Sequence, residues 1–499
     1  MTAPETLLFC LVLIPAQSSS SAQSNDLAAK SQRAKEFMAQ GKFAEAILLY
    51  RELNQAVPGN PGLMLNLGMA LHLTGDDRAS IPQLEAVVKL DPKLVPAWLF
   101  LGAARLELGQ ARTGLEALKM VLHLQPDHRG ALEMLASALL SLDRPTEAAN
   151  QYHKLAELDP ESSAAWYGLG RSYESLSVRA FDELQQTAPE SEYWLALVAD
   201  ARLHEQQLSG AFYLYRRALE KAPAMRGLHR AVAEIYRQTE HPDWASIEEQ
   251  KEVSLPPPDC RTPTFECQFR EGQFPQLLAA TKGANTPESH YWRSRAYNEL
   301  ALQAFTRLGQ LPPSLEQHEL RANIYNGKKK YADAVEEWRE ALKLSPTDKQ
   351  IQKQLAISLK FSQDYGAALP ILQRLLEGQP ASAELSFLVG ETLVDLQRVE
   401  EAIPVLKHAL ARDPKLLAAH KALARAYLAA GRAAQAIPHL QAALATDEDG
   451  SLHYQLASAY QASGQPSLSK QALLKYQKIQ GSAVAAREAA KREVEITAP

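Results

Sequence analysis

Seven prolines divide much of this chain into steps of equal length. Four of them stand 34 residues apart in the first third of the chain, and three more stand 34 residues apart in its last third: Pro58, Pro92, Pro126, Pro160, Pro346, Pro380 and Pro414. A fixed period of this length indicates a stack of similar supersecondary units and constrains the fold more than any other feature of the sequence.

One step of this ladder, residues 95–128, has the pattern of two helices joined by a turn. Its first half places four residues on one helical face, with spacings of three and four: Trp98, Leu101, Gly102 and Arg105. Gly109 can adopt the positive φ that ends a helix. The second half places another four on one face: Gly114, Leu118, Val121 and Leu122. Pro126 ends the second helix. Neither helix can bury its apolar face alone, so each unit needs neighbours.

The motif Trp98-x-x-Leu101-Gly102, a small residue within the second helix and a closing proline resemble the tetratricopeptide repeat. Corresponding residues recur in other units, including Leu67, Gly68, Trp166, Gly170, Val389, Gly390, Leu423 and Tyr427. The resemblance covers most of residues 27–480 in roughly 13 units if degenerate ones are counted. It implies an all-α, right-handed α-solenoid of helix-turn-helix repeats.

The repeat pattern predicts two arrays with a connector between them. We expect an N-terminal array over residues 27–237, with a shortened fifth unit, and a C-terminal array over residues 290–480. Residues 238–289 are predicted to form an irregular connector, because Pro256-Pro257-Pro258 cannot lie inside a helix. Residues 481–499 are predicted to form a polar tail or a capping helix, which makes an open solenoid end soluble.

An unusual module occurs twice, with an offset of 124 residues. Six residues of the first copy recur in the second: Arg171, Tyr173, Leu176, Ala180, Phe181 and Leu184 correspond to Arg295, Tyr297, Leu300, Ala304, Phe305 and Leu308. We interpret this as an internal duplication of a larger block, and the alternative is chance similarity among degenerate helices. The first copy lies in the shortened unit, where either the first helix continues or the second is abbreviated.

Residues 1–22 are predicted to be a signal peptide. Leu7–Ile14 is an apolar run too short to span a bilayer, and Ser20-x-Ala22 suits cleavage after Ala22. Against this, no Lys or Arg precedes the run and Glu5 does. Together with the resemblance, the segment indicates an exported repeat protein of bacterial type that is periplasmic or secreted. The alternatives are a cytoplasmic protein and lipidation at Cys10.

Cys260 and Cys267 are predicted to form a disulfide in the connector. They are two of only three cysteines, six residues separate them, and an exported chain meets oxidising conditions. The alternatives are two unpaired buried thiols and a zinc site. No motif spacing joins the cysteines to His241 or His290, which disfavours zinc.

The sequence contains no complete catalytic motif that we recognise. His204-Glu205 and His318-Glu319 begin like a metalloprotease motif, but Leu208 and Ala322 stand where the second histidine would be. The net charge of −5 gives no electrostatic reason to expect a nucleic-acid partner. We therefore expect a non-enzymatic chain without cofactor or metal and without an integral membrane span.

In the family that the chain resembles, the first helix of each unit lines a concave groove, and the fifth and ninth residues of the unit point into it. Carried over, these positions give Leu65, Met69 and Leu99 in the N-terminal array, and Lys353, Phe387, Lys421 and Arg425 in the C-terminal array. The first set could hold an amphipathic helix and the second an extended acidic segment. The alternative is that the leucines pad the next helix and the charges are solvated.

Some proteins of this family bind chaperone tails through a clamp of Lys and Asn residues. Asn66 occupies one such place, but Ser31 and Phe100 stand where basic partners would be, so that function is disfavoured. We expect a protein–protein interaction scaffold, an exported adaptor of the cell envelope. The alternatives are a peptide- or polysaccharide-binding protein and an enzyme with a site in the irregular centre.

Overall fold

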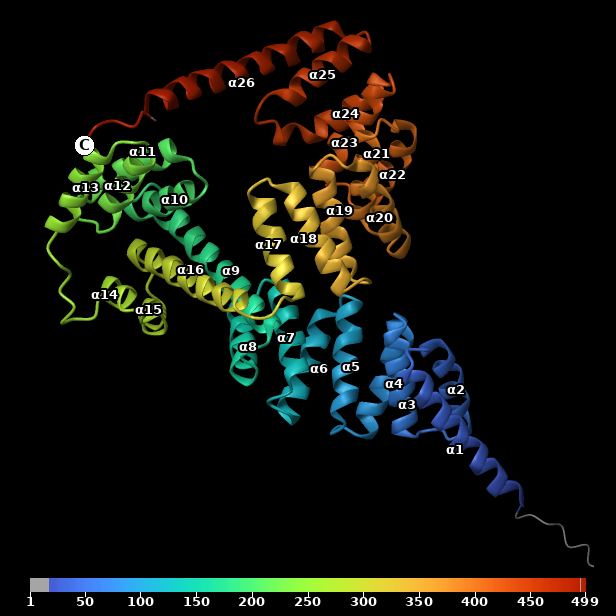
Figure 1. Cartoon of the computed structure of the whole chain (residues 1–499). Coiled ribbons are helices and arrows are strands. Elements are labelled where there is room, and N and C mark those ends of the chain that lie inside the picture. Colours follow the sequence, from blue (N-terminus) through green and yellow to red (C-terminus); the bar gives the residue numbers. More distant parts are fainter. Residues whose placement is uncertain (1–17, 494) are drawn as a thin grey trace, which may run out of the picture. The chain divides into compact units, whose positions relative to one another are not determined.

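The computed structural model describes residues 18–493 and 495–499, with side chains from residue 25 to residue 482 and from residue 495 onward. Over this part of the chain all regular secondary structure is helical, in 26 α-helices and one short 3₁₀ helix (Figure 1). The predicted all-α architecture of paired helices is thereby confirmed. Most of the predicted signal peptide, residues 1–17, lies outside the described residues, and the first helix begins at Ser18.

The chain divides into two compact units, Met1–Ser175 and Leu176–Pro499. The first unit consists of helical hairpins that follow the proline ladder. Its helices are α1 (Ser18–Ala39), α2 (Phe43–Ala56), α3 (Pro61–Leu73), α4 (Asp77–Leu90), α5 (Val95–Glu107), α6 (Ala111–Leu124), α7 (Arg129–Ser141), α8 (Pro145–Leu158) and the start of α9 (Ser163–Thr187).

The turn inside each hairpin of the first unit requires one residue with positive φ. Gly41, Gly75 and Gly109 supply it in three hairpins, and Asp143 does so in the fourth. The helix-ending role predicted for Gly109 is confirmed. The two helices of a hairpin then approach closely, because a Cβ atom on Gly102 would lie 2.8 Å from Leu118 of the second helix. Small residues at this position therefore set the spacing of the hairpin.

The second unit begins with the rest of α9 and two further hairpins. These are formed by α10 (Glu192–His204) with α11 (Leu208–Lys221) and by α12 (Leu228–Gln238) with α13 (Pro242–Ser254). Two short helices follow, α14 (Phe265–Arg270) and α15 (Phe274–Thr281). The predicted irregular connector, residues 238–289, thus contains three helices, and its longest non-helical stretch is residues 255–264. That stretch holds the three consecutive prolines.

Both copies of the duplicated module form one long, unbroken helix. These are α9, with 25 residues, and α16 (Pro287–Gly309), with 23 residues. In the shortened unit, therefore, the first helix continues. Within the second unit the two helices lie against each other, because Nη1 of Arg293 on α16 is 2.9 Å from Oε2 of Glu183 on α9.

Regular hairpins return after α16. The first helix of each hairpin is α17 (Leu315–Gly327), α19 (Lys349–Phe361), α21 (Ala383–Asp395), α23 (Leu417–Ala429) or α25 (Ser451–Ala462). The second helix is α18 (Tyr331–Leu344), α20 (Tyr365–Gly378), α22 (Val399–Arg412), α24 (Ala433–Ala443) or α26 (Pro466–Glu493). The predicted tail from residue 481 continues α26. Among the described helices, none is both long and apolar enough to cross a membrane.

Candidate binding groove and pocket

The predicted groove residues of the first unit lie on α3 and α5. Leu65, Met69 and Leu99 are all half-buried. Leu65 packs against the core cluster that contains Leu84 and Leu101. Leu65 thus contributes to core packing, and its role in binding stays a prediction.

The predicted groove residues of the second unit lie on three successive first helices. Lys353 belongs to α19, Phe387 to α21, and Lys421 and Arg425 to α23. Phe387 is half-buried and packs against the core of these hairpins. Lys421 and Arg425 face a shallow hollow of about 420 Å³ that Glu448 also lines. The structure thus brings the basic residues of α23 to an open surface.

Ion pairs connect these first helices in a regular pattern. Lys353 of α19 lies 3.2 Å from Glu384 of α21, and Lys360 of α19 pairs with Glu391 of α21. Arg425 of α23 lies 2.7 Å from Asp395 of α21. An acidic helix therefore stands between two basic ones.

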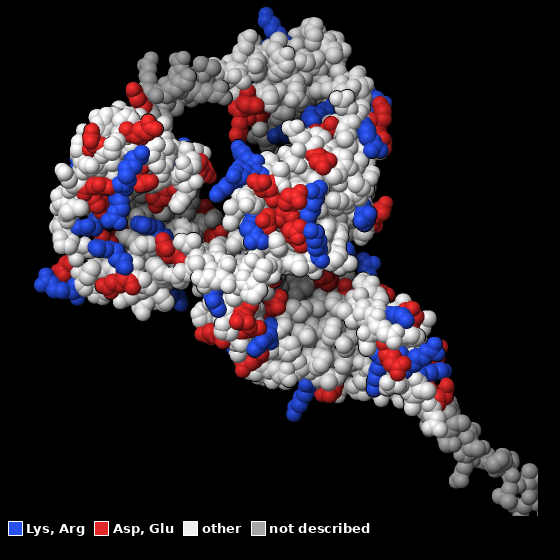
Figure 2. All heavy atoms as spheres, in the orientation of Figure 1, with Lys and Arg blue, Asp and Glu red and all other residues white. Residues whose placement is uncertain are grey.

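This mixture of signs extends beyond the three helices. Figure 2 shows acidic and basic side chains interspersed on the face in view, in keeping with the net charge of −5. Within the ion pairs between these helices, Glu384 and Arg425 are the more exposed partners, with side chains 60% and 45% exposed. These two side chains are therefore within reach of the charges of a bound chain.

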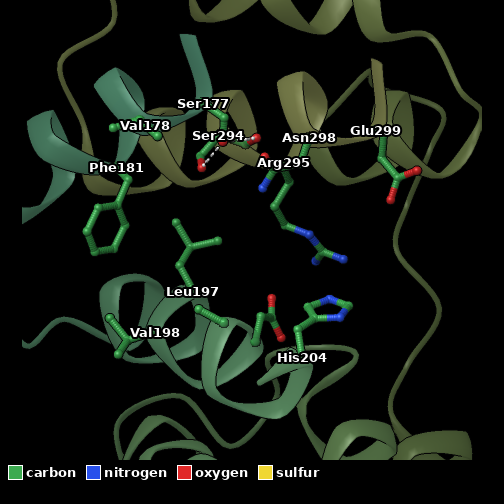
Figure 3. Close-up of a pocket in the computed structure, with 12 residues that line it drawn as sticks. Ser177, Val178, Phe181, Leu197, Val198, His204, Ser294, Arg295, Asn298 and Glu299 are labelled. Carbon is green, nitrogen blue, oxygen red and sulfur yellow. Dashed lines mark hydrogen bonds between the residues drawn. The ribbon is translucent and has the colours of Figure 1, made fainter. Parts of the chain in front are cut away.

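A larger hollow, of about 560 Å³, lies between α9, α10 and α16 (Figure 3). One wall is apolar and consists of Val178, Phe181, Leu197 and Val198. The opposite side is polar and consists of Asp200, His204, Arg295, Asn298 and Glu299. Figure 3 shows the guanidinium group of Arg295 extending from α16 toward the space above α10.

Aromatic side chains hold Arg295 in this position. Its Nη1 donates a hydrogen bond of 2.8 Å to the hydroxyl of Tyr291. Its guanidinium carbon lies 4.7 Å from the ring centre of Phe269 and 5.5 Å from that of Trp292. Contacts between a cation and aromatic faces are favourable, most of all where water is partly excluded. The position of the charge is therefore fixed by packing.

Asp200 of α10 faces the same space. The hydroxyl of Tyr215 donates a hydrogen bond of 2.5 Å to Oδ1 of Asp200. Burial raises the pKa of Asp200, while the hydrogen bond from Tyr215 and the charge of Arg295 act in the opposite direction. Burial also raises the pKa of Tyr215, and the neighbouring Asp200 raises it further. The hydroxyl of Tyr215 is therefore the proton donor of this pair.

No sequence motif predicts this pocket. In the sequence, Arg295 is identified only as part of the duplicated module, and His204 only as part of an incomplete metalloprotease motif. The available signal was the interruption of the 34-residue period in both copies. The structure also joins Cys260 and Cys267 in a disulfide between residues 255–264 and α14.

Family models of the tetratricopeptide repeat match five stretches of the chain. One matches residues 37–98, 362–426 and 393–460, and another matches residues 99–152 and 133–177. Among curated proteins, the chain is 23% identical over 383 residues to "Protein CTR9 homolog" of Arabidopsis thaliana, a match that covers 72% of this chain and 33% of the plant protein. The chain thus spans about a third of the length of that relative.

Two solved structures of repeat proteins match over much of the chain, both with low TM-scores. The Cut9–Hcn1 hetero-tetramer of the APC/C is 14% identical with a TM-score of 0.33, and the match covers 94% of this chain and 96% of that one. A tetratricopeptide repeat protein from Parabacteroides merdae is 13% identical with a TM-score of 0.32, and covers 67% of this chain and 99% of its own.

Proposed function

Because this chain is a tetratricopeptide repeat protein, we propose that it is a non-enzymatic scaffold that binds a segment of another protein along α19, α21 and α23. The observation that carries this proposal is the alternation of charge on these helices. Lys353 and Lys360 are followed by the carboxylates of α21, and then by Lys421 and Arg425. A bound chain with the complementary order of charges would exchange ion pairs with all three helices.

The spacing of the helices defines the partner further. Packed helices such as α21 and α23 lie about 10 Å apart, and an extended chain advances about 3.3 Å per residue. With a similar step from α19 to α21, complementary charges would recur about every three residues. The partner segment would carry an acidic, a basic and a second acidic residue in that order. It would be an extended segment, since a helix advances only about 1.5 Å per residue.

This proposal is tested with two fluorescent 12-residue peptides and the full chain. One carries the pattern Glu-x-x-Lys-x-x-Glu, and the other carries the reversed charges. We expect the first to bind more tightly, with an affinity that falls as salt is added, because exposed charges are screened. The double variant Lys421→Glu with Arg425→Glu should abolish this preference.

The matched control for the binding test is Arg339→Glu on α18, a second helix. Arg339 is about as exposed as Arg425 and pairs with Glu336 within its own helix. It should leave binding unchanged. Equal binding of the two peptides, or an unchanged preference in the double variant, would refute the groove as the binding surface.

The structure gives no support for a catalytic role of His318, which begins one of the two incomplete metalloprotease motifs. Its contacts are to neighbouring side chains of the same hairpin. Nδ1 of His318 lies 2.7 Å from Glu337, which also accepts a hydrogen bond of 3.0 Å from Nε of Arg321. These contacts connect α17 to α18, so His318 helps to hold the two helices of this hairpin together. They support a structural role for this residue.

We further propose that the scaffold is exported and acts in the cell envelope. The apolar run Leu7–Ile14 and the pairing of Cys260 with Cys267 support this. Fusing residues 1–22 to an alkaline phosphatase that folds only after export tests it. Phosphatase activity supports export. Its absence, when the same phosphatase is active behind a known signal peptide, contradicts it.

A further inference from the structure

Arg295 is the central group of the pocket between α9, α10 and α16. A guanidinium group has five N–H donors. One of them is used by the hydroxyl of Tyr291. Within the described residues, no carboxylate oxygen of Asp or Glu lies within 4 Å of its nitrogens. Arg295 lines the hollow and is partly buried, so this cation lacks a direct acidic partner in a partly desolvated place.

Two carboxylates stand near Arg295 without pairing with it. Asp200 accepts a hydrogen bond from Tyr215, and Glu299 lies one turn beyond Arg295 on α16. These two carboxylates would repel an anionic ligand that has no N–H group to donate to them. A ligand that suits both sides of the pocket therefore combines a carboxylate with a nearby N–H donor. The apolar wall opposite adds room for a hydrophobic side chain.

We propose that this pocket binds an α-amino carboxylate with an apolar side chain. Its carboxylate would form the paired hydrogen bonds that a guanidinium group favours, on Arg295. Its nitrogen would donate to Asp200 and Glu299. Its side chain would rest on Phe181, Leu197 and Val198. The volume of about 560 Å³ suits a small molecule or one end of a peptide.

The duplicated module explains why the pocket lies here. In regular hairpins a second helix packs beside the first, whereas α9 and α16 each continue as one long helix. Arg171 is the counterpart of Arg295 in the first copy, and it forms an exposed pair of 2.7 Å with Glu174. Equivalent arginines thus have different surroundings. This supplies an internal control for the role of Arg295.

Two sources share the proposed chemistry: a free apolar amino acid and the C-terminal residue of a peptide. Calorimetric titration of the full chain with L-leucine, L-leucinamide and the tripeptide Ala-Ala-Leu distinguishes them. Binding of leucine alone identifies a free amino acid, and binding of the tripeptide alone identifies a peptide end. Binding of both supports the shared chemistry. Leucinamide lacks the carboxylate and should bind at least tenfold more weakly than the ligand that binds.

Three variants test the assigned contacts. Arg295→Gln should weaken binding at least tenfold, whereas Arg171→Gln should leave it unchanged. Val198→Trp narrows the hollow from its apolar wall and leaves Arg295 unsubstituted, and it should also abolish binding, so the proposal is testable even where Arg295→Gln misfolds. The proposal is overturned if neither leucine nor the tripeptide binds at millimolar concentration. It is also overturned if leucinamide binds equally well, or if Val198→Trp retains full affinity.

Discussion

Ser177 on α9 and Ser294 on α16 have their hydroxyl oxygens 2.9 Å apart, although 117 residues separate them in the chain. The hydroxyl of Ser177 also lies 3.0 Å from the carbonyl oxygen of Ser294. Both side chains are buried and line the pocket that holds Arg295. The two copies of the duplicated module are thus joined within the second unit by a polar contact between small side chains. Small side chains here allow the two long helices to approach closely.

Replacing Ser177 by Ala should lower the free energy of unfolding by about 1 kcal/mol, the usual contribution of one intramolecular hydrogen bond. Urea unfolding of the full chain, followed by circular dichroism, measures this change. Val178→Ala is the matched control, because Val178 is the next residue on α9 and is 58% exposed. A loss as large in the control as in Ser177→Ala would contradict the assigned role.

Gly168→Ala should destabilise the first unit by about 1–3 kcal/mol, the usual cost of overpacking a core. A Cβ atom at this position of α9 would lie 2.1 Å from the ring of Tyr152 on α8. Gly130→Ala on α7 is the control, because its nearest neighbour would be an atom of His128 at 3.6 Å. The same unfolding experiment compares them. If both substitutions have equal effects, close packing of α8 on α9 is not what requires Gly168.

The repeated helical hairpins could be predicted from the sequence, whereas the pocket and the ion pairs between repeats could not. Gly102, Leu118 and the prolines recur with a fixed period, because every hairpin packs on the next in the same way. The pocket residues do not recur with the repeat period. Arg295 and Asp200 line the same pocket because α16 packs against helices that come earlier in the chain. Ion pairs were missed for a similar reason: Lys353 and Glu384 belong to different repeats.

The helices of the connector were not predicted from the sequence. Residues 238–289 have three helices where the sequence suggested an irregular segment, because Pro256-Pro257-Pro258 and a lost period hid the pattern of α13. Burial of Glu248 and Glu252 on α13 also obscured its apolar face. The long helices α9 and α16 were anticipated only as one of two alternatives.

The second unit should lose stability as the pH falls below about 6.5, the ordinary pKa of histidine. Burial lowers the pKa of His439 on α24, and the neighbouring His420 and Lys407 lower it further. The unfolded chain therefore binds a proton that the folded chain does not, so stability is retained above the unfolded pKa and declines below it.

Replacing His439 by Gln tests this pH dependence. Thermal unfolding measured between pH 5 and pH 8 should show a smaller decrease at low pH than in the unsubstituted chain. His153→Gln on α8 is the control, since His153 is exposed and pairs with Glu157 of its own helix. An unchanged pH profile in His439→Gln would refute the prediction.

Removing the disulfide should destabilise residues 255–264 and α14. A crosslink that closes a loop of this size restricts the unfolded chain by about 2–3 kcal/mol. The double variant Cys260→Ser with Cys267→Ser should therefore be cut faster by protease between Leu255 and Thr264. The unsubstituted chain treated with reductant should behave in the same way. If cleavage rates match those of the oxidised chain, the crosslink does not restrain this segment.

The contact between α12 and the C-terminal residues leads to the last prediction. The hydroxyl of Tyr236, whose side chain is fully buried, donates a hydrogen bond of 2.6 Å to the carbonyl oxygen of Thr497. Ile496 packs against the same core cluster. Deleting residues 495–499 should thus lower the stability of α12 by about 1–3 kcal/mol, because a buried hydroxyl loses its acceptor.

Hydrogen exchange of α12 amides measures this effect, and two single variants separate its parts. Ile496→Ala should increase exchange, because it removes apolar contact with the cluster around Tyr236. Thr497→Ala should not, since Tyr236 binds the backbone carbonyl, which alanine keeps. Equal exchange in the deletion variant and the full chain would show that α12 is stable without these residues. An effect of Thr497→Ala as large as the deletion would assign the contact to the threonine side chain instead.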